Sequence, residues 1–473
     1  MEKQFFTAAI STEIFKIISD ASKQLQLESY VIGGFVRDFL LKRGTAKDID
    51  IVAIGSGIAL AEKVASLLPN KPKVQIFKTY GTAMLRYKDV DIEFVGARKE
   101  SYSEESRNPL IFEGTLQEDQ NRRDFTINAL ALSLNEENFG ALLDPFNGME
   151  DLENGIIKTP LDPDITYSDD PLRMMRAIRF ATQLNFTIEA ASLAAIAKNA
   201  KRLEIITRER IVDELNKIMG AVKPSVGFLL LEQTHLLSQV LPELIDLKGV
   251  EEVEGQKHKD NFYHTLEVVD NISENTADLW LRWAALLHDI GKAPTKRFSK
   301  KVGWTFHSHE FVGAKMVYNL FKRLRMPLNN KMKFVQKMVL LSSRPIVLAT
   351  DVTDAAVRRL VFDAGDDIHS LMTLCEADIT TKNPKKFKKY HQNFEVVRSK
   401  IKEVEERDRV RNFQPPVSGK EIIKAFNLKP CREIGQIKEA IKEAILEGQI
   451  PNEHEACYDF MLAKGVGLGL TVA

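Results

Sequence analysis

At 473 residues, the chain exceeds the roughly 250–300 residues at which a single hydrophobic core stops growing, so we expect three or four packed units. Its 44% apolar and 28% charged residues exclude a disordered chain, and lysine plus arginine balance aspartate plus glutamate at 66 each, which argues against indiscriminate coating of nucleic acid. No apolar run approaches the roughly 20 residues that cross a bilayer, and the start lacks a signal-peptide core. Three cysteines without CxxC spacing predict neither disulfides nor a thiolate zinc site, so we expect a cytoplasmic protein with no membrane partner.

Short runs rich in β-branched residues, separated by turns, fill the first 160 residues. They predict strands over residues 30–32, 49–54, 83–87 and 90–95. From about Asp169 onward, apolar residues recur at helical spacing and strand signals nearly vanish. The fold class is therefore predicted to be α+β, with a mixed sheet and helices at the N-terminus and an all-α remainder.

A tight turn at Gly33 and Gly34 joins the first predicted strand to a helix. Because glycine has no Cβ, backbone amides in such a turn can approach a phosphate chain, and the N-terminus of the following helix adds partial positive charge. A Gly-Gly turn considered alone is more often structural.

Asp48 and Asp50 stand at positions i and i+2 of the next predicted strand, so both carboxylates point to one face. This pair is costly unless a cation lies between the two groups, and its oxygen ligands suit Mg²⁺; a solvated edge strand is the alternative. Glu93, in a later strand, is the candidate third carboxylate, with Asp91 on the same face as its rival. Three carboxylates that hold two metal ions about 4 Å apart activate a terminal hydroxyl and stabilise a pyrophosphate leaving group. The cluster predicts phosphoryl-transfer chemistry.

Several motifs, in this order, resemble those of bacterial tRNA nucleotidyltransferases and the related bacterial poly(A) polymerases. They are Gly33-Gly-Phe-Val-Arg-Asp38, Asp48-Ile-Asp50, Arg122-Arg-Asp-Phe-Thr-Ile-Asn-Ala129, Asp144-Pro-Phe-Asn-Gly148 and the segment 169–180. The resemblance implies that Asp48 and Asp50 bind Mg²⁺ with Glu93 as third carboxylate. It further implies a nucleotide site lined by Gly33, Gly34, Arg37, Arg122, Arg123 and Asn128.

A predicted helix in the last of these motifs carries three arginines on one stripe, a geometry that suits a polyanion: Arg173, Arg176 and Arg179. Ser168 is expected to cap this helix, which would begin at Asp169, where the resembling family usually has glutamate. Asp170 and Arg173 would then lie together. One carboxylate acceptor and one guanidinium donor match the Watson–Crick edges of cytosine and adenine, although an ordinary salt bridge is the alternative.

Five of the nine histidines lie between His258 and His309. Imidazole and carboxylate ligands together suit borderline divalent metals, whereas a lone histidine is more often a core or surface residue. The order His, His-Asp, Asp resembles the HD phosphohydrolase superfamily, a helical domain that hydrolyses phosphate esters with bound metal. His309, with His307, departs from this minimal pattern but resembles the extra ligands of some members. The resemblance implies a divalent transition metal bound by His264, His288, Asp289, His309 and Asp378.

These observations predict four domains. They are a nucleotidyltransferase head at residues 1–160, a helical neck with the base-reading helix at 161–227, a helical body with the HD domain at 228–380, and a helical, tRNA-binding tail at 381–473. In the tail, Lys385-Lys-Phe-Lys-Lys-Tyr390 interleaves cations with aromatic rings, which suits either RNA contact or a solvated helix face. The segment from about Glu100 to Glu118 separates Glu93 from the arginine motif and resembles the flexible loop of full CCA-adding enzymes, which implies a flexible loop here.

The resemblance implies template-independent addition of C, C and A to the 3′ end of tRNA from CTP and ATP. A poly(A) polymerase is the close alternative. A protein that is chiefly an HD-type phosphohydrolase and a noncatalytic RNA-binding module are further alternatives, against which the three carboxylates argue.

Overall fold

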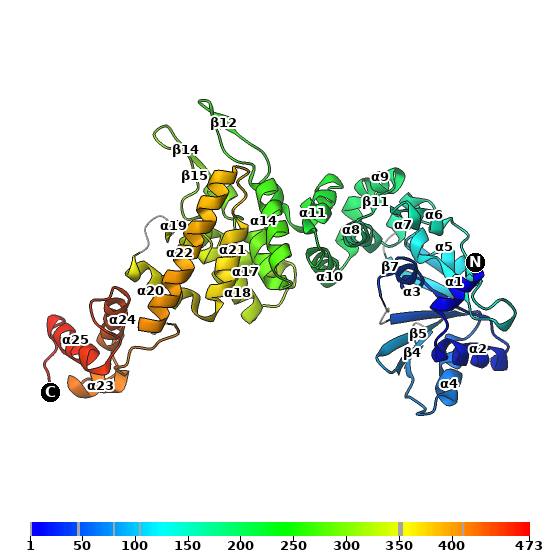
Figure 1. Cartoon of the computed structure of the whole chain (residues 1–473), viewed down its shortest axis with the longest axis horizontal. Coiled ribbons are helices and arrows are strands. Elements are labelled where there is room, and N and C mark those ends of the chain that lie inside the picture. Colours follow the sequence, from blue (N-terminus) through cyan, green and yellow to red (C-terminus); the bar gives the residue numbers. More distant parts are fainter. Residues whose placement is uncertain (1, 45–47, 79–80, 104–105, 349–352, 409–410) are drawn as a thin grey trace. The chain divides into compact units, whose positions relative to one another are not determined.

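The computed structural model describes residues 2–44, 48–78, 81–103, 106–348, 353–408 and 411–473. The chain folds into two compact units, Met1–Pro242 and Glu243–Ala473, which are coloured blue to green and green to red in Figure 1. Among the described helices, none has the length and apolar character that a bilayer crossing requires.

A seven-stranded sheet in the order β3-β4-β5-β2-β1-β8-β9 forms the centre of the first unit. Its strands are β1 Ser29–Ile32, β2 Asp48–Ala53, β3 Gln75–Phe77, β4 Thr82–Tyr87, β5 Val90–Gly96, β8 Ala131–Ser133 and β9 Leu142–Leu143. The β2–β5 pair is parallel and the other neighbours are antiparallel, so the predicted mixed sheet is confirmed.

Helices α2 (Glu13–Leu25) and α4 (Gly57–Leu67) pack on each other and against this sheet. Their apolar residues, such as Ile18 and Leu60, are completely buried, which stabilises the strands that carry the predicted carboxylates. Helix α3 (Gly34–Leu40) starts directly after the Gly-Gly turn.

The segment for which a flexible loop is predicted forms an antiparallel hairpin of β6 (Arg98–Ser103) and β7 (Ser106–Glu113), followed by α5 (Leu116–Asn121). The loop prediction is therefore wrong about secondary structure over the described residues. The charged and serine-rich first part of the segment gives no strand signal in the sequence, but the cross-strand ladder satisfies its backbone groups.

The remainder of the first unit is mainly helical. Its elements are α1 Glu2–Ala9, α6 Gly148–Glu153, α7 Pro163–Asp169, α8 Leu172–Leu184, α9 Ala190–Asn199, α10 Arg208–Met219, α11 Pro224–Gln233, α12 Leu236–Val240, the short 3₁₀ helices η2 Thr126–Asn128, η3 Glu136–Asn138 and η4 Ala200–Ile205, and the strand pair β10 Ile156–Ile157 and β11 Thr187–Ile188. Helix α13 (Pro242–Ile245) begins at the boundary between the units.

The predicted helix start at Asp169, capped by Ser168, is wrong. Asp162 caps α7, which continues through Asp169, and α8 begins only at Leu172. Because the residue before a proline is disfavoured in the α region, Asp170 adopts an extended conformation before Pro171 and separates the two helices.

The second unit is almost entirely helical, as predicted. Its helices are α14 Asn261–Asn275, α15 Leu279–Leu287, α16 Lys292–Thr295, α17 His309–Arg323, α18 Asn330–Leu341, α19 Arg344–Leu348, α20 Asp354–Ala364, the 3₁₀ helix η5 Gly365–Asp367, α21 Ile368–Ala377, α22 Pro384–Asp408, α23 Gly419–Ala425, α24 Arg432–Leu446 and α25 His454–Gly467. Two short ribbons interrupt them, β12 Glu252–Val253 with β13 Gln256–Lys257, and β14 Arg297–Ser299 with β15 Gly303–Thr305. Helices α14, α15, α18 and α21 pack together around fully buried residues such as Trp283.

Candidate active sites

The first candidate site is a carboxylate face on β2 and β5. These strands are parallel, and their register places Asp50 opposite Glu93 and Asp48 opposite Asp91. Since side chains alternate along a strand, all four carboxylates lie on the same face of the sheet. Burial raises the pKa of Glu93, and the charge of Asp50 raises it further. Such mutual repulsion is relieved by a bound cation, so the donor set fits a metal site.

Asp91, the rival third carboxylate, has a cation beside it. Arg86 of β4 lies opposite Asp91, and its Nε is 3.8 Å from Asp91 Oδ1. Glu93 instead lies beside Asp50. Burial raises the pKa of the Asp50 carboxyl, although the charge of Arg123 opposes this shift. The surroundings therefore favour Glu93 as the third member of the cluster.

Gly33 lies beside this carboxylate face. Its φ of +83° is a conformation that L side chains rarely adopt, and a Cβ built on it would lie 3.0 Å from Arg123 Nη1 and 3.6 Å from Asp50 Oδ2. The Gly33 amide donates to the Leu130 carbonyl, so the turn is fixed to the chain before β8. At Gly34, a Cβ would lie 3.7 Å from Arg37 Nη2, an ordinary van der Waals contact.

Arg37 and Asn128 form a buried polar link. Arg37, only 7% exposed, donates from Nη1 to Asn128 Oδ1 at 2.7 Å and stacks over the Phe180 ring. Asn128 in turn donates from Nδ2 to Asp124 Oδ1 at 3.0 Å. Both predicted nucleotide ligands are thus engaged within the protein, where they connect the helix after the Gly-Gly turn to α8.

Arg122 and Arg123 converge on a carboxylate that the sequence interpretation missed. Fully buried Asp119 lies 2.6 Å from Arg122 Nη2 and 3.3 Å from Arg123 Nη2. Although burial opposes it, the charges of Arg123 and Arg122 lower the pKa of the Asp119 carboxyl. Glu100 of the hairpin also approaches Arg122, at 3.2 Å. These contacts fix both guanidinium groups near the carboxylate face.

The stripe of arginines on α8 is largely neutralised by acids of the same unit. Arg176 Nη2 lies 2.6 Å from Asp124, and Arg179 Nε lies 2.6 Å from Glu214. Arg173 donates from Nη2 to the Arg122 carbonyl at 2.7 Å. The local sequence around α8 does not predict these partners, because they come from segments remote in the sequence.

The structure separates Asp169 from Asp170. Asp169 and Arg173 line a cavity of about 260 Å³ together with Arg122, and burial raises the pKa of the Asp169 carboxyl. The Asp170 carboxylate instead accepts a hydrogen bond from the Leu172 amide at 3.2 Å, in the first turn of α8. The residue that departs from the resembling family's glutamate therefore lies on the cavity.

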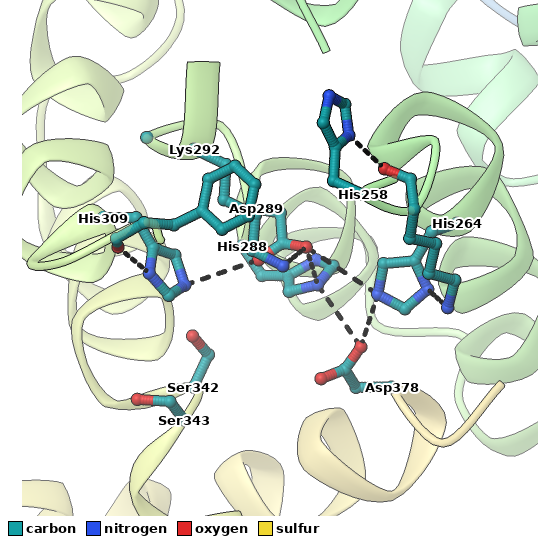
Figure 2. Close-up of polar contacts among 12 residues, drawn as sticks. His258, His264, His288, Asp289, Lys292, His309, Ser342, Ser343 and Asp378 are labelled. Atoms are coloured by element: carbon teal, nitrogen blue, oxygen red, sulfur yellow. Dashed lines mark hydrogen bonds and ion pairs between the residues drawn. The ribbon is translucent and has the colours of Figure 1, made fainter. Parts of the chain in front are cut away.

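The second candidate site is a metal centre in the C-terminal unit, and Figure 2 shows its side chains converging from several helices. His264 on α14, His288 after α15 and Asp378 after α21 place one ligand atom each within 4.8 Å of one another. His264 Nε2 is 2.8 Å and His288 Nε2 is 3.5 Å from Asp378 Oδ1. Asp289 Oδ2 lies 3.3 Å from His288 Nε2, and His309 Nε2 lies 3.6 Å from Asp289 Oδ1. All five predicted residues are brought together.

Hydrogen bonds to backbone carbonyls orient two of these imidazoles. His288 Nδ1 lies 2.7 Å from the Ala285 carbonyl, and His309 Nδ1 lies 2.9 Å from the Phe306 carbonyl, so each Nε2 faces the centre. The Nε2 atom of His288 and the Oδ1 atom of Asp378 are both buried, and they are shared among the imidazoles and carboxylates of the cluster. Although burial opposes it, the charges of the neighbouring aspartates raise the pKa of His288 to about 10. This excess of negative charge fits a divalent metal.

Two lysines near the centre were not foreseen from the sequence. Lys292 Nζ is 2.6 Å from Asp289 Oδ2. Lys259 Nζ is 2.8 Å from His264 Nδ1 and donates to Thr380 Oγ1 at 2.5 Å. Burial lowers the pKa of Lys259. Neither lysine belongs to a motif that the spacing reveals.

Family models match three consecutive segments of the chain. A model described as "Poly A polymerase head domain" matches residues 29–158, one described as "Probable RNA and SrmB- binding site of polymerase A" matches 185–247, and one described as "HD domain" matches 261–383. Together with the two sites, these matches define a nucleotidyltransferase with a fused HD domain. Both kinds of domain are generally metal-dependent.

Curated relatives of this chain are tRNA nucleotidyltransferases. The A-adding tRNA nucleotidyltransferase of Deinococcus radiodurans is 31% identical over 72% of this chain and 78% of that protein, and the Multifunctional CCA protein of Shewanella frigidimarina is 32% identical over 75% and 84%. The CCA-adding enzyme of Anoxybacillus flavithermus is 36% identical over an aligned region that covers 55% of this chain and 60% of that relative. The chain belongs to the tRNA nucleotidyltransferase family, as the sequence motifs predict.

Solved structures share the fold. "The structure of CCA-adding enzyme apo form I" matches with a TM-score of 0.63 at 24% identity, covering 95% of this chain and 93% of that one. A Thermotoga maritima CCA-adding enzyme complexed with tRNA matches with a TM-score of 0.59 at 22% identity, covering 95% and 94%. The predicted α+β class is confirmed.

Proposed function

We propose that this enzyme adds C, C and A in turn to the 3′ end of tRNA, using CTP and ATP and no nucleic-acid template. The observation that carries the proposal is the strand register that places Glu93 opposite Asp50, with Asp48 on the same face. A curated relative named CCA-adding enzyme and structures of CCA-adding enzymes with ATP, with CTP and with tRNA support the choice of substrates.

In this proposal, Asp48, Asp50 and Glu93 hold Mg²⁺. Bound Mg²⁺ supplies a Lewis acid for the attacking hydroxyl and for the pyrophosphate leaving group. Arg122 and Arg123, fixed by Asp119, present positive charge beside the carboxylate face and hold the triphosphate. The strand turn at Gly33 leaves room for this approach, since no Cβ lies between Asp50 and Arg123.

The other predicted nucleotide ligands divide into two groups. We assign Arg37, Asn128, Arg176 and Arg179 to positioning, because each is held by a partner inside the same unit. We assign Arg173 and the Asp169/Asp170 segment to contacts with the base of the incoming nucleotide, because Arg173 and Asp169 line a cavity together with Arg122. Gly34 contributes the first turn of α3, where a phosphate can approach the backbone.

Two relatives named A-adding tRNA nucleotidyltransferase, 31% and 32% identical, favour addition of the final A alone as the second candidate. One assay separates the candidates: purified protein is incubated with tRNA that lacks CCA, or that ends in CC, and with each nucleotide in turn. Ordered addition of C, C and A to the first substrate supports the proposal. Addition of one A to the second substrate only identifies an A-adding enzyme, and long adenylate tails identify a poly(A) polymerase.

For the HD domain, we propose that His264, His288, Asp289, His309 and Asp378 hold a divalent transition metal and hydrolyse a phosphate ester. The convergence of His264, His288 and Asp378, whose ligand atoms lie within 4.8 Å of one another, carries this assignment. Metal analysis of the purified protein, together with hydrolysis of p-nitrophenyl phosphate after addition of Mn²⁺, Co²⁺, Ni²⁺ or Zn²⁺, tests it. A protein that retains none of these metals and hydrolyses nothing would refute the assignment.

A further inference from the structure

Hydrogen bonds set the proton position on two imidazoles of the HD centre in favour of a metal. Nδ1 of His288 lies 2.7 Å from the Ala285 carbonyl, and Nδ1 of His309 lies 2.9 Å from the Phe306 carbonyl. Because a carbonyl oxygen only accepts, each Nδ1 carries the proton that it donates. The Nε2 lone pair of such a ring, when neutral, is free to bind a metal.

His264 is held in the opposite way. Its Nδ1 lies 2.8 Å from Lys259 Nζ, and an ammonium group has three donors and no acceptor, so this Nδ1 accepts. Its Nε2 lies 2.8 Å from Asp378 Oδ1 (Figure 2), and a carboxylate only accepts, so this Nε2 carries the proton. Both contacts specify one tautomer, in which the nitrogen that faces the metal centre has no lone pair to offer.

The backbone of Lys259 is anchored beside the metal centre. Its carbonyl accepts a hydrogen bond from His258 Nδ1 at 2.9 Å. The next residue, Asp260, caps α14, and its Oδ1 accepts from the Phe262 amide at 3.0 Å. The side chain of Lys259 is exposed, so its ammonium group can turn into solvent while the backbone stays in place.

Thr380 is able to serve either tautomer of His264. Its Oγ1 lies 3.1 Å from His264 Nδ1 and accepts a hydrogen bond from Lys259 Nζ at 2.5 Å. A hydroxyl group both donates and accepts, so Thr380 can accept a hydrogen bond from a protonated Nδ1 once the ammonium group has left. The lysine cannot make this change, because it has no acceptor.

We infer that Lys259 is a positioning residue that competes with the metal for His264, and that metal uptake requires its ammonium group to leave so that Nδ1 donates to Thr380. The inference rests on the proposed metal centre. During uptake, the ring loses the proton on Nε2 to solvent and gains one from solvent on Nδ1, so its proton count is unchanged. Lys292 imposes no such conflict, because the Asp289 carboxylate that it contacts keeps further lone pairs.

Metal affinity gives the first test. The metal-free full chain, carrying Asp50→Ala to weaken the site in the head, is titrated with Co²⁺ at one fixed pH. Binding that His288→Ala abolishes is assigned to the HD centre. Lys259→Met should raise this affinity about 10- to 100-fold, the ratio that a hydrogen bond to a charged group contributes. The matched control is Lys257→Met, which removes a lysine paired with Glu252 at 3.0 Å and should leave the affinity unchanged.

The other partner of the same nitrogen should act with the opposite sign. Thr380→Val should lower the affinity for Co²⁺ about 10- to 100-fold, the usual cost of losing the partner of a metal-binding histidine, and Thr380→Ser should restore it. Nitrogen-15 NMR of the metal-free protein with labelled histidine reads the tautomer, and the signals of His264 are those missing from His264→Gln. We expect a bare Nδ1 in the wild type and a protonated Nδ1 in Lys259→Met, a change that a purely structural lysine would not cause.

A protonated His264 Nδ1 in the metal-free wild type would overturn the inference, as would equal affinities of Lys259→Met and Lys257→Met. A rise in affinity without a change of tautomer would also overturn it, because loss of charge alone then explains the rise. If no variant shows Co²⁺ binding that depends on His288, the proposed metal centre fails and the inference fails with it. If such binding is present but does not respond at Lys259 or Thr380, the inference alone fails.

Discussion

Asp50 on β2 lies directly opposite Glu93 on the parallel strand β5. This relationship joins carboxylates 43 positions apart in the sequence numbering into one acidic face, and it distinguishes Glu93 from its neighbour Asp91, which has Arg86 beside it. The catalytic proposal can therefore be tested with a control two residues away on the same strand.

We expect Asp48→Ala, Asp50→Ala and Glu93→Gln each to abolish nucleotide addition, because each removes an oxygen ligand of the proposed Mg²⁺ site. tRNA binding and the free energy of unfolding should change little, since removing one charge relieves repulsion within the cluster. Single-turnover nucleotide addition measures the effect. Asp91→Asn is the control and should retain addition; a reversed result would exchange the roles of Glu93 and Asp91.

Gly33→Ala should lower both stability and activity. At φ +83°, a Cβ is strained and lies 3.0 Å from Arg123 Nη1, so we expect a loss of about 1–3 kcal/mol in the free energy of unfolding. Denaturant titration and nucleotide addition measure the two effects. Gly34→Ala is the matched control, because its nearest contact beyond the chain neighbours is an ordinary 3.7 Å. Equal losses in both variants would show that the conformation of Gly33 is not the cause.

Base choice can be tested at Asp170. Asp170→Ala removes the proposed acceptor for the exocyclic amine of cytosine or adenine, so preference for CTP and ATP over UTP and GTP should fall more than the catalytic rate on a bound nucleotide. The same change removes the hydrogen bond to the Leu172 amide, a capping loss of about 1 kcal/mol. Asp170→Asn keeps an acceptor for that amide and isolates the effect on the base. Four-nucleotide competition measures both variants, and unchanged preferences would place base selection elsewhere.

The HD centre should be separable from nucleotide addition. His288→Ala with Asp289→Ala removes two side chains of the proposed metal site, so metal content and p-nitrophenyl phosphate hydrolysis should be lost. Addition of nucleotides to tRNA should persist, because the carboxylate face belongs to the other compact unit. Elemental analysis and the two activity assays provide the measurements. Loss of both activities would indicate a structural metal or coupling between the units.

Acid stability should depend on Asp124. Although burial opposes it, the charge of Arg176 and the hydrogen bond from Asn128 lower the pKa of the Asp124 carboxyl to about 2. Because the folded pKa lies below the unfolded value of 3.8, this group stabilises the fold above about pH 4, and that stabilisation, on the order of 2 kcal/mol, is lost as the pH falls toward 2. Asp124→Asn should therefore be less stable than the wild type at pH 7, with a difference that narrows between pH 4 and pH 2. Thermal unfolding across this range measures it, and a constant difference would contradict the assignment.

The two-residue period of β2 was enough to predict that Asp48 and Asp50 share a face, since side chains alternate along any strand. The same argument could not choose between Glu93 and Asp91. That choice depends on the strand register and on Arg86 from a third strand, and neither is encoded locally.

The arginines show a second limit. Arg176 and Arg179 share a helical stripe in the sequence, but their partners Asp124 and Glu214 lie 52 and 35 positions away. A charged stripe considered alone cannot reveal whether the fold supplies counter-charges. The break before α8 has a local cause, because Pro171 disfavours the helical conformation at Asp170, but the predicted helix start at Asp169 overlooked it.

The buried chain of contacts from Arg37 through Asn128 and Asp124 to Arg176 has a consequence for how specificity can vary. It ties α8 to the strand turn beside the carboxylates. Tilting or sliding α8 to suit another base would leave a buried charge without its partner, which is strongly destabilising. On the proposed base-reading role of positions 169, 170 and 173, we therefore expect new nucleotide preferences to arise through exchange of these side chains and not through displacement of the helix that carries Arg173.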